Sequence, residues 1–128
     1  MQGQLRGSIE DNVLTCLCWS ELHAAQVSLR VPPSLFSTRA YQKIAEKAIE
    51  HLSKYGHPPG VHLQDIMEAE LDRGSEGTFL RSILGEMYAL QSQLDATFVL
   101  ESLDRWIDSQ KLSQAVNAAA DALHDGEL

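Results

Sequence analysis

The 128-residue sequence has only two cysteines, Cys16 and Cys18, and they lie two positions apart. At this spacing two cysteines of one helix point to different sides, so they cannot form an unstrained disulfide. This excludes a disulfide framework and fits a reducing compartment, the cytoplasm. No run approaches the roughly 18 consecutive apolar residues that span a membrane, and the polar start is not a signal peptide. We therefore expect a cytoplasmic protein with no membrane partner.

The sequence also lacks the glycine-rich loops that bind nucleotide phosphates. No Gly-Lys pair occurs, so the phosphate loop of ATPases is absent, and no Gly-x-Gly-x-x-Gly is present. Positive charge is scarce: 10 Lys and Arg against 18 Asp and Glu give a net charge of -8. A nucleic-acid binder needs the opposite sign or a segregated basic patch. We therefore predict that the chain is not an enzyme and holds no cofactor, and that any binding to nucleic acid is weak.

β-branched residues are sparse, whereas Leu and Ala are abundant, and this balance favours helices over strands. The length suits one domain with one core. We predict an all-α fold: a compact body of four to five helices, a protruding antiparallel helical hairpin and a long C-terminal helix. Residues 1–7 are expected to form a flexible leader, residues 8–124 the helical domain, and residues 125–128 a polar tail or an expression boundary. Helical patterns begin at Ser8 and cover Ser20–Arg30, Thr38–Tyr55, His62–Leu71, Thr78–Leu90 and Asp95–Leu123.

Helix-terminating residues support several of these boundaries. Ser8 is placed to cap the first helix, and two prolines end the second. Gly56 supplies a left-handed cap for the third helix, and Pro58 prevents its continuation. In the second helix, the residues expected to carry the apolar face are Leu22, Ala25 and Leu29.

The last segment carries two apolar stripes that lie on nearly opposite sides of one helix. Either the helix breaks near Asp108-Ser109, or its two halves serve different surfaces. The short connection from Gln91 to Leu94 suggests that this helix and the preceding one form an antiparallel hairpin. The first stripe consists of Val99, Leu103, Trp106 and Ile107, and the second of Leu112, Val116, Ala119 and Leu123.

Metal-ligating side chains occur without the paired spacing of zinc sites. The cysteines are therefore interpreted as small core residues and the histidines as surface loop residues. No local signature marks a catalytic nucleophile. The candidate ligands are Cys16, Cys18 and His23 in one region, and His51, His57 and His62 in another.

One basic strip stands out in this acidic chain. Its residues lie within about a quarter turn of one another, opposite the apolar stripe of the third helix. The strip is either a solvated helix face or a contact for an acidic partner or a nucleic-acid single strand. It consists of Arg39, Lys43, Lys47 and Lys54.

The order of these features resembles the N-terminal domain of DnaB-type bacterial replicative helicases over residues 8–124. The motifs that carry the resemblance are Glu10-x-x-Val13-Leu14-x-x-Leu17, Phe36-x-x-x-x-Tyr41-x-x-Ile44, Gly56-His57-Pro58 and Gly77-x-Phe79-Leu80. The resemblance implies a non-catalytic domain that pairs through its hairpin, builds the helicase ring, and docks primase or the helicase loader. A full-length parent would then be an ATP-dependent DNA helicase.

The resemblance and the excess apolar surface together predict a self-complementary dimer interface. Two other functions stay open: a free-standing adaptor that imitates this domain to load or inhibit a helicase, and a weak single-strand binder that uses the basic strip. Whether the aromatic residues of the hairpin are core residues or contact anchors is also open. The predicted interface consists of Leu84, Met87, Tyr88, Phe98, Leu103, Trp106 and Ile107.

Overall fold

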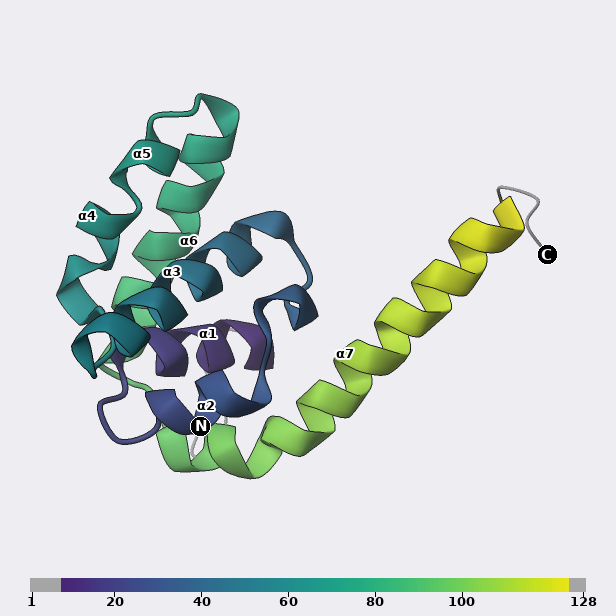
Figure 1. Ribbon diagram of the computed structural model, residues 1–128, viewed down its shortest axis with the longest axis horizontal. Helices are drawn as coiled ribbons and strands as arrows, with labels where there is room; N and C mark the ends of the chain where they lie inside the picture. Colours follow the sequence, from purple (N-terminus) through teal and green to yellow (C-terminus); the bar gives the residue numbers. More distant parts are fainter. Residues whose placement is uncertain (1–7, 125–128) are drawn as a thin grey trace.

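The computed structural model describes residues 8–124, and within this range it contains helices and no strand (Figure 1). The predicted all-α class is confirmed. The predicted leader and tail lie outside the described residues. The helices are α1 (Ile9–Trp19), α2 (Ala24–Arg30), the 3-10 helix η1 (Pro33–Leu35), α3 (Arg39–Tyr55), the 3-10 helix η2 (Gly60–His62), α4 (Leu63–Ile66), α5 (Glu68–Leu71), α6 (Ser75–Gln91) and α7 (Ala96–His124).

Helix α1 is the centre of the body. It begins with a capping box, in which the Asp11 backbone N–H donates to the Ser8 hydroxyl at 3.0 Å and the Ser8 N–H donates to the Asp11 carboxylate at 3.3 Å. Every residue from Asn12 to Cys18 is buried. This burial follows from the packing of α2, α3, α6 and α7 around α1.

Helix α3 confirms the predicted boundaries most closely. The Thr38 hydroxyl accepts from the Tyr41 N–H at 3.2 Å, and Gly56 adopts the left-handed conformation, with φ 79°, that ends the helix. The apolar face of α3 rests on α1 through Ile44, Ala45 and Ala48, which are fully buried.

Two predicted helices differ in the structure. Helix α2 begins at Ala24, because Ser20 ends α1 and a turn follows it; the buried residues are therefore Ala24 and Val27. The expected inward positions of Leu22, Ala25 and Leu29 were wrong, since all three are exposed and both leucines are more than four-fifths exposed. The segment 62–71 is divided into α4 and α5 at Met67, whose ψ of 2° interrupts the helix while its side chain stays in the core.

Helix α7 is one continuous helix of 29 residues, with no break at Asp108-Ser109. Its first half packs against α1 and η1, and its second half extends away from the body as a single helix (Figure 1). The predicted antiparallel hairpin is not confirmed: α6 and α7 each pack on α1, and α7 runs away from α6 after the turn between them (Figure 1).

Candidate interaction surface on helix α7

The structure places most of the predicted interface in the core of a single chain. Phe98 is half-buried, and Tyr88 is 53% exposed, with its ring edge-on to Trp19 at 5.9 Å. The prediction that a second copy covers the remaining five residues was wrong. Helices α6 and α7 each pack against α1, and this third helix buries side chains that a two-helix hairpin would leave exposed. The residues already buried in one chain are Leu84, Met87, Leu103, Trp106 and Ile107.

Polar contacts hold the first half and the middle of α7 in position. The Gln110 side-chain amide donates to the Leu35 carbonyl at 2.9 Å, and the Gln114 amide donates to the Ser34 carbonyl at 2.9 Å. Nearer the start of the helix, Arg30 forms an ion pair with Asp104. The Trp106 ring packs against Phe36 with centroids 5.4 Å apart. These contacts direct the rest of α7 away from the body.

From Leu112 onward, on the side away from these contacts, α7 presents an apolar face to solvent. Residues 111–121 are all exposed, and no charged residue occurs between Leu112 and Ala120. Leu112 is 66% exposed, Val116 58% and Leu123 64%. The second apolar stripe predicted from the sequence is therefore present and uncovered within the described chain. Alanines flank it at 115, 118, 120 and 122, so another helix can approach closely.

The stripe belongs to a longer row of positions on one side of α7. Near the start of α7, each seam residue directly precedes a buried one, so the row lies about 100° around the helix from the buried residues Val99, Leu103 and Trp106. Its residues alternate at spacings of four and three, which is the pattern of the a and d positions in a coiled coil. We call this row the outward seam; it consists of Phe98, Ser102, Arg105, Ser109, Leu112, Val116, Ala119 and Leu123.

The seam begins beside a groove at the foot of α7. The groove has a volume of about 380 Å³ and lies between the start of α1 and the first turns of α7. Its walls combine apolar surface from Phe98 and Trp106 with the polar side chains of the seam. The lining residues are Ile9, Phe98, Ser102, Arg105, Trp106 and Ser109.

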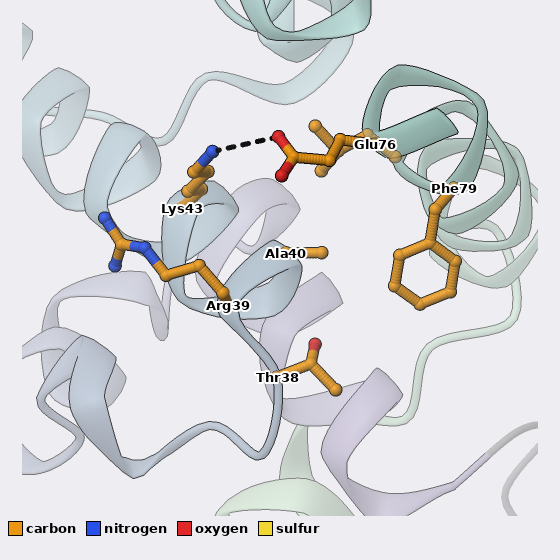
Figure 2. Close-up of a pocket in the computed structure, with 7 residues that line it drawn as sticks. Thr38, Arg39, Ala40, Lys43, Glu76 and Phe79 are labelled. Atoms are coloured by element: carbon orange, nitrogen blue, oxygen red, sulfur yellow. Dashed lines mark ion pairs between the residues drawn. The ribbon is translucent and has the colours of Figure 1, made fainter. Parts of the chain in front are cut away.

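A second recess lies between α3 and α6 (Figure 2). Lys43 and Glu76 point toward one another across it, with Nζ and Oε2 3.9 Å apart, and the Phe79 ring lines the α6 side (Figure 2). Arg39 pairs with Glu46 at 3.3 Å. Two of the four cations of the predicted basic strip are thus offset by carboxylates.

The other two strip residues lie in the middle and in the last turn of α3. Lys47 and Lys54 line a recess of about 170 Å³ together with Glu50. The Lys54 Nζ lies 5.3 Å from the Tyr55 ring centroid, and the His51 ring packs at a tilt against Tyr55 with centroids 4.6 Å apart. His51 lies within α3, so the prediction that it is a loop residue was wrong. With Glu46, Glu50 and Glu76 interspersed, the strip does not form a uniformly basic surface.

The cysteines are buried core residues, as predicted. Burial raises the pKa of the Cys16 thiol to about 11, with a hydrogen bond to Ser20 acting weakly in the other direction. Burial raises the pKa of Cys18 still further, helped by its neighbour Cys16. Both thiols are therefore poor nucleophiles at neutral pH. Among the described residues, no group of three or more His, Cys, Asp or Glu side chains lies close enough to hold a metal ion.

No helix within residues 8–124 is long and apolar enough to cross a membrane. Comparison of the chain with protein-family models, curated proteins and solved structures finds no match. The resemblance to the helicase domain therefore stays a prediction that depends on the motifs quoted above.

Proposed function

We propose that this chain is a non-catalytic assembly domain that associates with further copies of itself through the outward seam of α7. The observation that supports the proposal is the row of exposed apolar residues on the part of α7 that projects from the body. A single helix that projects from a body buries little surface of its own, and most helical stability comes from packing an apolar face. A partner helix on the seam supplies that packing.

A second copy is the favoured partner because the exposed stripe contains small and aliphatic residues without charge, so two copies bring no like charges together there. Full burial of one Leu or Val side chain contributes about 1.5–3 kcal/mol. Two copies bury six such side chains, from Leu112, Val116 and Leu123. Association costs about 4–15 kcal/mol, so we expect a dimer that dissociates in the micromolar range.

Sedimentation equilibrium on the full chain tests this proposal. The wild-type mass is expected to rise from 14.2 kDa toward twice that value as the concentration reaches the high micromolar range. Replacing Leu112, Val116 and Leu123 by Gln, a good helix former, removes the apolar face and should give monomers with unchanged helix content.

The matched control replaces two still more exposed leucines, Leu22→Gln in the turn before α2 and Leu29→Gln in α2, which should leave the dimer intact. A wild-type chain that stays monomeric at high micromolar concentration contradicts the proposal, as does a control variant that dissociates as readily as the α7 variant.

The resemblance to the helicase domain extends the proposal to a cellular process, DNA replication. In that setting the domain is part of a replicative helicase in the cytoplasm, contributes to assembly of the ring, and docks primase or the loader. Titration of the chain with a purified primase from a DnaB-type system tests this extension. Binding supports it, whereas a chain that dimerises without binding primase is an assembly domain outside replication.

Adding the chain to an intact DnaB-type helicase ring distinguishes a free-standing adaptor from a building block of the ring. An adaptor binds the assembled ring and changes its unwinding rate. A building block of a ring associates with its own copies and leaves the preassembled ring unaffected.

A further inference from the structure

The outward seam also indicates how two copies are oriented. We infer that two α7 helices pair antiparallel over their whole exposed length, so that Leu123 of each copy enters the groove beside Phe98 of the other. The inference depends on the proposed self-association, and it adds the orientation, the register and the role of the groove.

The seam matches itself in this orientation. In an antiparallel pair centred between Ser109 and Leu112, each a position faces a d position of the second copy, which is the layer pattern of antiparallel coiled coils. The apolar end of one helix then covers the mixed, partly polar end of the other. The four facing pairs are Phe98 with Leu123, Ser102 with Ala119, Arg105 with Val116, and Ser109 with Leu112.

Repulsion between like charges disfavours a parallel pair of α7 helices. In a parallel, in-register pair, Arg105 of one copy faces Arg105 of the other within the seam, and two like charges on facing positions are destabilising. In the antiparallel pair, Arg105 faces Val116 and lays its aliphatic stem along it. The acidic residues that border the seam, Glu101 and Asp108, then face Ala122 and Ala115 of the second copy.

The groove at the foot of α7 favours pairing of the two helices over their full exposed length rather than over residues 112–123 alone. A short antiparallel register that pairs only residues 112–123 also has apolar layers, but it leaves the groove of about 380 Å³ and the half-buried Phe98 uncovered. Full overlap places Leu123 between Ile9 and Phe98, where apolar walls receive it. It therefore covers more apolar surface than the short register.

Disulfide cross-linking of two variants, each with one added cysteine, tests the register. Ser102→Cys and Ala119→Cys are small changes at seam positions, and the native thiols do not compete near neutral pH because both are buried with a raised pKa. Each variant is oxidised alone and in an equimolar mixture, and cross-linked dimers are separated by mass. Sedimentation of the same samples under reducing conditions reports whether they associate at all.

Full antiparallel overlap predicts a cross-link in the mixture and none in either variant alone. In that arrangement residue 102 of one copy lies beside residue 119 of the other. The two copies of residue 102 are about 25 Å apart along the pair at 1.5 Å per residue, and so are the two copies of residue 119. Cross-linking of Ser102→Cys with itself indicates a parallel pair and overturns the inference. Cross-linking of Ala119→Cys with itself, without the mixed product, indicates another register and overturns it too.

A dimer by sedimentation that gives no cross-link also overturns the inferred register but leaves the proposed assembly function standing. Chains that neither cross-link nor associate overturn both the register and the proposed function.

Discussion

Gly77 of α6 lies directly against the backbone carbonyl of Leu71 at the end of α5. A Cβ atom built on Gly77 would lie 2.1 Å from the Leu71 oxygen and 2.6 Å from its carbonyl carbon. No side chain can occupy that space unless the backbone moves. This contact sets how closely α6 approaches α5, and it gives a physical reason for the glycine in the Gly77-x-Phe79-Leu80 motif.

Gly77→Ala is therefore expected to destabilise the fold by about 1–3 kcal/mol, in the range typical of overpacking, because a backbone group must shift. Gly85 of the same helix provides the matched control, since nothing lies within 4 Å of its Cβ position. Gly85→Ala should stabilise the protein by about 0.5–1 kcal/mol through helix propensity. Urea denaturation followed by circular dichroism measures both. Equal effects of the two substitutions would show that the close approach at Gly77 does not matter.

The hydrogen bonds from the Gln110 and Gln114 amides, at the middle of α7, should stabilise the whole fold. Removing both in Gln110→Ala/Gln114→Ala leaves backbone carbonyls of the 34–35 segment without these donors, at about 0.5–1.5 kcal/mol for each lost hydrogen bond. The expected total is a loss of about 1–3 kcal/mol in the free energy of unfolding. Asn117→Ala, at an exposed position further along α7, is the control and should cause no loss. If both variants unfold at the wild-type urea concentration, the amides do not anchor the helix.

Alkaline pH should destabilise the protein. The folded state raises the pKa of the Cys16 and Cys18 thiols, mainly through burial, so it holds their protons more tightly than the unfolded state does. This contribution is complete below the ordinary thiol pKa of 9.0 and is lost as the pH rises above it. Stability is expected to fall above pH 9 by about 1.4 kcal/mol per pH unit and per group.

Burial and the hydrogen bond to Asp11 also raise the pKa of Tyr41, which adds to the decline above pH 10. Denaturation between pH 7 and pH 10.5 measures the slope. The Cys16→Ala/Cys18→Ala variant, although less stable throughout, should lose stability less steeply between pH 9 and pH 10. An unchanged slope in this variant would assign the alkaline loss to other groups.

Local patterns in the sequence identified the helices well. Ser8, Thr38 and Gly56 mark helix ends through hydrogen bonds and backbone geometry that involve only a few neighbouring residues, so the prediction needed no knowledge of packing. The second apolar stripe of α7 was also recognised from spacing alone, and the structure confirms that it is exposed.

The prediction failed where the answer depended on which helices meet. Trp106 and Leu103 were assigned to an interface because the segment after Gln91 was expected to fold back on α6 as a hairpin. In the structure α7 crosses onto α1 and η1, and these elements bury both residues. The groove beside Phe98 could not be predicted either, since it combines α7 with Ile9 from the other end of the chain.

The central claim is that a second copy covers the outward seam, and amide hydrogen exchange along α7 at low and high protein concentration tests it most directly. We predict that amides of residues 112–124 exchange fast in dilute solution and slow down as the concentration rises, while those around Leu103 stay protected throughout. Exchange in residues 112–124 that is equally fast at every concentration would contradict the account.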